Sequence, residues 1–205
     1  MNKRLMWNFE INTKIPLHIP EPVHEETLPE RWESRFFWPE QTIIVLNGLH
    51  DDCLDLSRYE AKHRQDIYCI LPEQDYNLKI RRNQLLYKPM VMKTGQAVAY
   101  GKKINVSEQQ SPIKLPGTEQ ADSSALLAEI NRSGKQVIVE KEAMLYRFET
   151  KPTLKLELAR LWVANTIWFS VSIESRSKYL VDSITQQMFG DKESCDYVAF
   201  LKGFT

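Results

Sequence analysis

The sequence predicts an α+β protein in which strands dominate: a curled antiparallel barrel or tunnel of eight strands with a few flanking helices. Two observations lead to this prediction. Polar and apolar residues alternate in several short segments, which is typical of strands with one buried face, and most of the connections between these segments are short. An antiparallel sheet of that size tends to curl and close, because closure removes its exposed edges. A two-layer α+β sandwich is the alternative.

The chain of 205 residues is long enough for one domain with a substantial core. Residues 1–30 are expected to form an extended N-terminal arm, since prolines at positions 16, 20, 22 and 29 exclude a continuous helix there. Residues 31–205 are then expected to form a single barrel domain.

The first elements of this domain are predicted from local patterns. In residues 31–38, RWESRFFW, aromatic and charged residues alternate, which predicts a strand. Residues 39–49 are predicted to form a short helix, because Pro39 occupies a helix-start position and Gly48 lies near the end.

The middle of the chain reads as a series of strands. They are predicted at 64–71, 77–82, 84–93 and 97–107. A tight hairpin is expected at Arg82-Asn83, because Asn tolerates a positive φ.

The second half combines strands with two helices. A loop at 108–121 precedes a helix at 123–133, for which Asp122 is a plausible N-cap. Strands are then predicted at 135–148, 154–162 and 166–174, and an amphipathic helix at 178–189.

Composition narrows the function classes. Lys plus Arg equals Asp plus Glu at 27 each, so the basic excess typical of broad nucleic-acid or anionic-membrane binding is missing. The three cysteines and four histidines show no zinc or disulfide spacing. Neither a signal peptide nor a membrane-length apolar run is present, so a cytoplasmic location is expected. The oligomeric state is left open.

One cluster of charged residues points to an anion site. In LKIRR, Lys79 and Arg81 share a strand face, as Asp66 and Tyr68 do in the strand before, and Lys88 ends the strand after. A cationic row facing the inside of a sheet is costly unless an anion lies there. The row therefore predicts a site for a phosphate compound. The alternative is a solvated outer face of the sheet, where Lys and Arg are ordinary.

The order and spacing of these segments over residues 31–189 resemble the CYTH superfamily of triphosphate tunnel metalloenzymes. This family includes class IV adenylate cyclases, thiamine triphosphatases and inorganic triphosphatases. The segments that carry the resemblance are WESRFFWP, RQDIY, LKIRR, LLYKP, VIVEKEAMLYRF and FSVSIES. They are similar to the family's ExExK strand, its Asp-x-Tyr strand, its LRIR strand, its lysine-ending strand, its K-x-R strand and its closing ExE strand, in that order.

The resemblance implies a set of site residues. The cations that would bind phosphates are Arg35, Lys79, Arg81, Lys88 and Lys141. Glu33 and Glu174 would be catalytic and would bind Mg²⁺ or Mn²⁺, with Asp66 as a third possible metal ligand. Three positions depart from the family pattern: Arg31 replaces the first acid of ExExK, Ala143 replaces the arginine of K-x-R, and Ser172 replaces the first acid of ExE.

Three functions remain open after this comparison. The first is a metal-dependent phosphohydrolase that acts on inorganic triphosphate or on a nucleoside or thiamine triphosphate. The second is a non-catalytic module that binds a polyphosphate or nucleotide through the retained cations, and the third is a plain interaction protein. The retained cations favour the first two, and the missing acids favour the second over the first.

Overall fold

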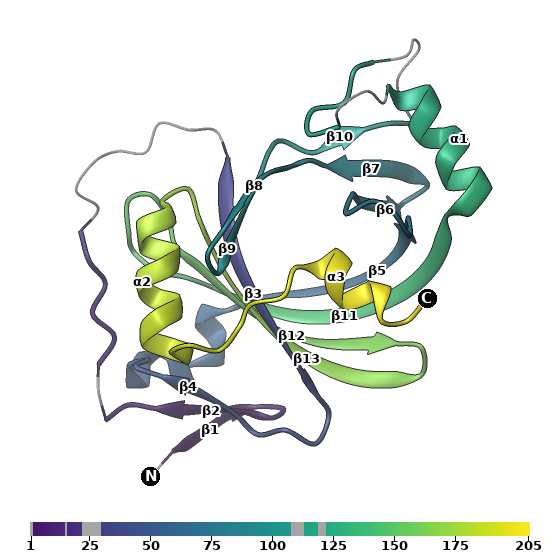
Figure 1. The fold of residues 1–205 in the computed structure, drawn as a ribbon. Helices are drawn as coiled ribbons and strands as arrows, with labels where there is room; N and C mark the ends of the chain where they lie inside the picture. Colours follow the sequence, from purple (N-terminus) through teal and green to yellow (C-terminus); the bar gives the residue numbers. More distant parts are fainter. Residues whose placement is uncertain (1, 15, 22–29, 108–112, 119–121) are drawn as a thin grey trace.

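The computed structural model describes residues 2–14, 16–21, 30–107, 113–118 and 122–205. The strands are β1 (Lys3–Met6), β2 (Phe9–Asn12), β3 (Arg31–Pro39), β4 (Ile44–Asn47), β5 (Glu60–Ile70), β6 (Asn77–Arg81), β7 (Gln84–Lys88), β8 (Met90–Thr94), β9 (Ala97–Tyr100), β10 (Ile104–Asn105), β11 (Lys135–Arg147), β12 (Lys155–Val163) and β13 (Thr166–Ser175). The helices are α1 (Ser123–Ser133), α2 (Lys178–Phe189) and α3 (Tyr197–Lys202), with short 3-10 helices at Asp51–Leu54 and Leu56–Arg58 (Figure 1).

Ten strands form one curled sheet in the order β10-β7-β6-β5-β11-β12-β13-β3-β9-β8 (Figure 1). A bent two-stranded ribbon links its two ends. Strand β8 follows β7 directly after Pro89, and the backbone N–H of Gly101 donates to the Pro89 carbonyl across the bend (3.0 Å). At one end of the ribbon, β7 pairs with β6. At the other end, β9 pairs with β3. The sheet therefore curls around an interior, with the ribbon joining its two ends.

The prediction of a curled antiparallel sheet in an α+β fold is confirmed, but the number of strands is wrong, with ten in this sheet instead of eight. The predicted strands 84–93 and 97–107 are each split in two, at Pro89 and at 101–103. Proline has no N–H to donate to a strand ladder, so pairing is interrupted there and the ribbon bends.

A second sheet of three strands, in the order β1-β2-β4, lies on the outer side of the large sheet (Figure 1). The predicted extended arm thus contains an antiparallel pair, β1 and β2, within its first residues. Its residues 22–29 lie outside the described residues. The domain boundary at residue 30 stays a prediction.

The predicted helix at 39–49 is wrong. Pro39 ends β3, and Ile44–Asn47 form β4, which pairs in parallel with β2. Ile44 and Leu46 are buried, whereas Val45 lies between them on the other face. The β-branched run Ile43–Val45 favours a strand once a pairing partner is present.

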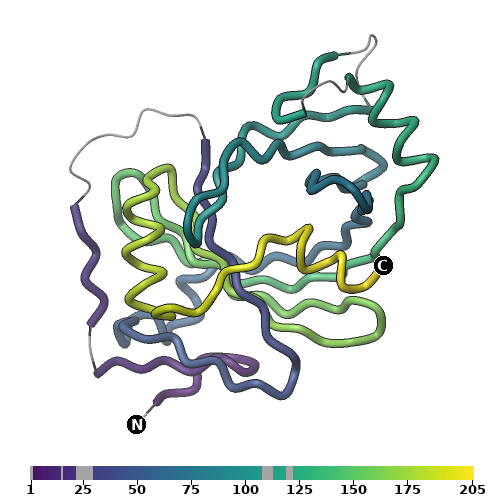
Figure 2. Tube along the Cα trace, in the orientation of Figure 1, coloured from purple at the N-terminus to yellow at the C-terminus, as the bar shows by residue number. Residues whose placement is uncertain are grey.

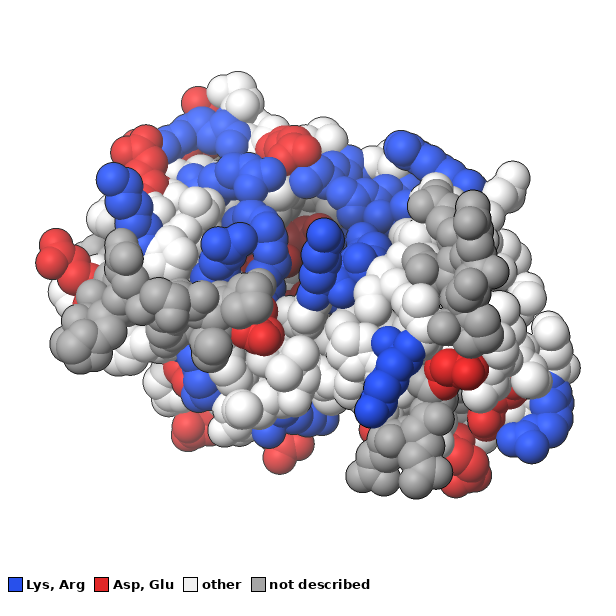
Figure 3. All heavy atoms as spheres, turned by 90° about the horizontal axis from the view of Figure 1, so that it is seen from above, with Lys and Arg blue, Asp and Glu red and all other residues white. Residues whose placement is uncertain are grey.

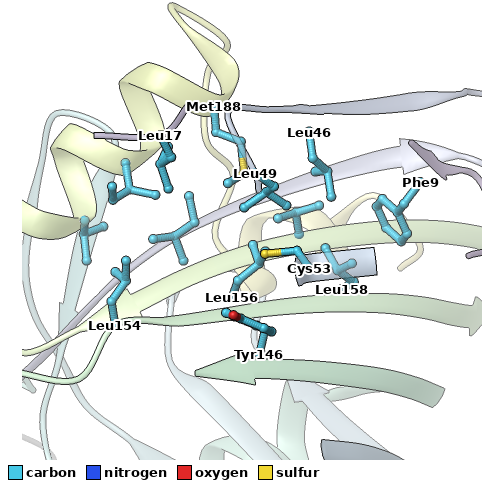
Figure 4. Packing of buried hydrophobic residues seen from close by; sticks show 14 of the residues in the cluster. Phe9, Leu17, Leu46, Leu49, Cys53, Tyr146, Leu154, Leu156, Leu158 and Met188 are labelled. Carbon is cyan, nitrogen blue, oxygen red and sulfur yellow. The ribbon is translucent and has the colours of Figure 1, made fainter. Parts of the chain in front are cut away.

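The main core lies between the outer face of the large sheet, the small sheet and α2. Figure 4 shows how Leu156 and Leu158 of β12, together with Leu154 just before this strand, pack toward Leu46 of β4 and Met188 of α2. All five side chains are fully or almost fully buried. Successive side chains of a strand point to opposite faces of the sheet, so the side chains between these leucines must face the interior of the curled sheet.

Helices α1 and α2 have the predicted bounds, and the Asp122 side chain caps α1 by accepting from the backbone N–H groups of Ser124 and Ala125 (both 2.9 Å). Leu126 of α1 packs with Leu78 and Tyr87 on the outer face of β6 and β7. This packing fixes which face of β6 and β7 points inward. No helix in the described part of the chain is both long and apolar enough to cross a membrane.

The short helix α3 was not predicted. It packs on the interior face of the curled sheet, and Figure 2 shows the C-terminal segment crossing the region that the sheet encloses. Tyr197 stacks on Tyr68 of β5 (centroids 4.9 Å apart), and Phe200 stacks on Phe37 of β3 (3.8 Å). The C-terminal segment therefore fills part of the interior with aromatic rings.

Candidate functional site: a cationic cavity inside the curled sheet

The interior face of the curled sheet lines a cavity of about 540 Å³. Ten of its lining residues are Lys or Arg and three are Glu. The cations are Arg31, Arg35, Arg64, Lys79, Arg81, Lys88, Lys102, Lys103, Lys141 and Arg176, and the acids are Glu33, Glu157 and Glu174. Seen from above, Lys and Arg side chains gather around a hollow in this face of the molecule (Figure 3).

The predicted cationic row lines this cavity. Lys79, Arg81 and Lys88 all contribute to the wall, on strands β6 and β7. Arg81 donates two hydrogen bonds to Asp66, from Nε to Oδ1 and from Nη2 to Oδ2 (both 2.5 Å), and Lys79 Nζ donates to Oδ2 (3.1 Å). Asp66 thus faces the same interior and holds two of the cations in place. The phosphate-binding role of the row stays a prediction.

These contacts shift the pKa values of the group. Burial opposes ionisation of Asp66, but the hydrogen bond from Arg81 and the charge of Lys79 outweigh it and lower the pKa of this carboxyl. Burial lowers the pKa of Lys79 to about 7, because Asp66 only partly compensates for the lost water. The single carboxylate of Asp66 does not balance the charges of both Lys79 and Arg81. A bound anion would therefore favour the protonated form of Lys79 and raise its pKa.

A second ion-pair network runs from β3 to β12 and β11. Arg35 Nε donates to Glu33 Oε1 (2.8 Å), and Lys88 Nζ donates to Glu33 Oε2 (3.3 Å). Glu157 Oε1 accepts from Lys141 Nζ (2.8 Å) and lies 3.5 Å from Arg35 Nη1. Each of the five side chains is less than a quarter exposed.

The acids of this network remain ionised despite their burial. Burial raises the pKa of Glu157, but the charges of Lys141 and Arg35 lower it to about 2. The same balance holds the pKa of Glu33 well below its usual range, with Lys88 and Arg35 as the opposing charges. Burial lowers the pKa of Lys141, and the charge of Glu157 only partly offsets this.

Four lining cations have no acidic partner among the described residues. These are Arg64 on β5, Lys102 and Lys103 between β9 and β10, and Arg176 between β13 and α2. Arg64 is half-buried and the other three are exposed. Burial and the charges of Arg81 and Lys88 lower the pKa of Lys103. The cavity therefore has balanced ion pairs in its wall and a surplus of positive charge at its rim.

The predicted metal ligands are only partly brought together. Glu33 and Glu174 lie directly opposite each other on β3 and β13, and both line the cavity. Asp66 instead binds Lys79 and Arg81, and no cluster of three or more His, Cys, Asp or Glu side chains suited to a metal ion occurs in the described residues. Glu33 already accepts hydrogen bonds from Arg35 and Lys88, and Glu174 accepts from Arg31 (2.7 Å) and Lys155 (3.2 Å).

A hard divalent ion takes six or more oxygen ligands and usually more than one carboxylate from the protein. In this arrangement the carboxylate oxygens face Lys and Arg, so the donor set does not fit Mg²⁺ or Mn²⁺ unless Glu33 and Glu174 release their partners. The role of either metal stays a prediction.

Several lining residues were missed at the sequence level. Glu157 lies between buried leucines in LKLELARLW, and this alternation could have placed it on the interior face. Tyr197, whose ring lies 5.1 Å from the Arg35 guanidinium, comes from a helix too short to show a periodic pattern. No local signal predicts that this ring enters the cavity.

Comparisons with known proteins add little to this description. No protein-family model and no curated protein matches the chain. Among solved structures, the chain is similar to the crystal structure of a presumed adenylate cyclase from Bacillus halodurans, over 87% of this chain and 100% of that one. The identity is 6% and the TM-score is 0.41.

Proposed function

We propose that this protein binds a triphosphate-bearing anion in the cationic cavity, holding it through its own Lys and Arg side chains. The observation that carries the proposal is the surplus of cations: ten line the cavity, and four of these have no acidic partner in the described part of the chain. Arg64 is half-buried and the other three are exposed, and all four add positive charge to a cavity whose buried cations are already paired. A bound anion lowers the free energy of this excess of like charge.

The shape and composition of the cavity support a phosphate chain as the ligand. The cations come from β3, β5, β6, β7 and β11 and from the segments that follow β9 and β13, so they can contact successive phosphates from several sides. Arg64 and Arg81 offer planar groups with several N–H donors, which match phosphate oxygens. This is the non-catalytic binding module among the functions that the sequence left open.

Isothermal titration calorimetry with inorganic tripolyphosphate in the presence of EDTA tests the proposal. Arg64→Ala is the sharpest variant, because Arg64 has no acidic partner in the described structure and its loss leaves no carboxylate unpaired. We expect a loss of about 1.5–3 kcal/mol, or roughly 10- to 150-fold in Kd, the scale of a hydrogen bond to a charged group.

Arg132→Ala is the matched control, since Arg132 is an exposed arginine on α1 that does not line the cavity. It should leave the affinity unchanged. Equal affinities for wild type, Arg64→Ala and Arg132→Ala would mean that the cations are a solvated surface and would refute the proposal.

A second candidate function is metal-dependent hydrolysis of a triphosphate. It is favoured by one observation, the opposed positions of Glu33 and Glu174 on neighbouring strands at the cavity wall. Two carboxylates can hold Mg²⁺ or Mn²⁺ when phosphates and waters complete the coordination, provided that Glu33 and Glu174 first release their Lys and Arg partners. Such an ion would polarise the phosphoryl group.

Phosphate release from tripolyphosphate, ATP and thiamine triphosphate, each with Mg²⁺ or Mn²⁺, tests this second function. Glu174→Gln should abolish release while the protein stays folded, and Glu140→Gln, at an exposed acid on β11, should not. Equal turnover in Glu174→Gln would discard the assignment of this pair. Absence of turnover in the wild type with all three compounds would favour the binding module.

A further inference from the structure

A second cavity, of about 430 Å³, adjoins the first and shares part of its wall. Three residues line both cavities: Arg31, Glu174 and Arg176. The residues that line only the second are Arg147, Pro152, Thr153, Lys155 and Ser175. The two cavities therefore adjoin each other where β3 and β13 lie side by side.

The second cavity also has more positive than negative charge. Of the described residues in its lining, four are Lys or Arg, and Glu174 is the one acid. Glu174 is shared by Arg31 and Lys155, so its single charge serves two cations. Arg147 forms an ion pair with Glu60 of β5 (2.9 Å), and both side chains are about half exposed. Exposed pairs of this kind are weak, so Arg147 can turn toward an anion at little cost.

Among the residues that the structure describes, no aromatic side chain lines the second cavity. A nucleobase or a thiazolium ring is usually held by stacking on aromatic rings or by an apolar wall. Here the wall consists of arginines, a lysine, the glutamate Glu174 and small polar residues, together with one proline. The second cavity is therefore suited to a further anionic group and poorly suited to a base.

We propose that the two cavities together bind a linear inorganic polyphosphate longer than three phosphates, with a triphosphate segment in the first cavity and the continuing chain in the second. This inference rests on the proposed function and extends it, because it names the class of ligand. Arg31 and Arg176 lie at the junction and contact the chain as it passes from one cavity to the other.

The test compares two ligands on the same variants by calorimetry, at fixed ionic strength and with EDTA: inorganic tripolyphosphate and a long-chain polyphosphate. In Arg147→Ala we expect the affinity for the long chain to fall about tenfold, the scale of one charge-assisted contact, and the affinity for tripolyphosphate to stay within about twofold. Arg147→Lys keeps the charge and should retain most of the long-chain affinity.

Arg4→Ala is the matched control, because Arg4 is a half-exposed arginine in a weak ion pair on β1. It should change neither affinity, and the thermal midpoint of each variant shows that it is folded. Tripolyphosphate binding with an unchanged long-chain affinity in Arg147→Ala would overturn this inference and leave the proposed function intact. No tripolyphosphate binding in the wild type would remove both. An Arg147-dependent gain for ATP over tripolyphosphate would assign the second cavity to a nucleoside and also overturn the inference.

Discussion

Replacing Glu157 by Gln tests how the buried charges of the cavity are balanced. Glu157 accepts a hydrogen bond from Lys141 (2.8 Å) and lies 3.5 Å from Arg35. The glutamine keeps the shape of the side chain and removes its charge. Lys141 then loses its acidic partner in the described structure, whereas Arg35 keeps Glu33.

The size of the effect follows from the burial of the pair. The side chains of Glu157 and Lys141 are 14% and 13% exposed, so water can do little to screen the remaining charge. Removing one partner of a buried pair typically costs about 3–5 kcal/mol. We expect the lower end, about 3 kcal/mol, because Lys141 has a lowered pKa and can lose its proton. For a protein of this size, that corresponds to a thermal midpoint lowered by roughly 6–12 °C.

The same variant should respond more strongly to an anion. With Glu157 uncharged, Lys141 has lost the carboxylate that it pairs with, so we expect tripolyphosphate to raise the midpoint of Glu157→Gln more than that of the wild type. Saturation at 100 times Kd contributes about 2.7 kcal/mol, which is enough to recover most of the loss.

Thermal unfolding followed by circular dichroism, with and without tripolyphosphate, measures both effects. Glu140→Gln is the control, since Glu140 is 45% exposed and pairs with the exposed His63. Its effect on stability should be close to zero. A midpoint for Glu157→Gln equal to that of the wild type, with an equal ligand response, would refute the view that Glu157 balances the buried cations.

Three further predictions concern single contacts. Arg81→Ala should weaken tripolyphosphate binding by about 1.5–3 kcal/mol, because it removes a guanidinium and leaves the negative charge of Asp66 without its arginine partner. An unchanged Kd in calorimetry would contradict this. Binding should weaken as the pH rises through about 7, where Lys79 loses its proton, and this part of the pH dependence should disappear in Lys79→Gln. The stability of the protein should change in the opposite direction. Between the folded pKa of about 7 and the ordinary value of 10.5, Lys79 holds more protons in the unfolded chain than in the folded one. The contribution of this group to the free energy of unfolding therefore rises with pH. Finally, Asp122→Ala should destabilise the protein by about 0.5–2 kcal/mol through loss of the α1 N-cap, as measured by urea unfolding, and a denaturation midpoint equal to that of the wild type would contradict the capping role.

Local patterns in the sequence were sufficient for most of the elements. Helices at 123–133 and 178–189 have the predicted bounds, and the strands at 77–82 and 166–174 differ from β6 and β13 by one residue at one end. These segments have a strong period of their own, and their burial follows it. Alternation also placed Lys79 and Arg81 on one face, because side chains two residues apart in a strand cannot face opposite sides.

The errors arise where pairing overrides the local signal. Residues 39–49 begin with a proline and end near a glycine, which is the pattern of a short helix, yet Ile44–Asn47 form β4 because β2 offers a parallel partner. β2 lies more than 30 residues earlier in the chain, so no local window contains both strands. The division of the predicted strand 84–93 at Pro89 was visible in the sequence, but the bend that follows depends on the curvature of the whole sheet.

The sequence by itself determined which residues can face the interior, because the two-residue period of a strand assigns every side chain to one of two faces. Only the tertiary structure decided which interior residues meet. Arg35, Lys141 and Glu157 come from β3, β11 and β12, and their contacts depend on strand order and on the curl of the sheet. Tyr197 enters the same cavity from a short C-terminal helix. The net charge of the cavity is the sum of charged side chains from all of these strands and helices. Because they lie far apart in the sequence, the pattern within any one segment cannot predict this net charge.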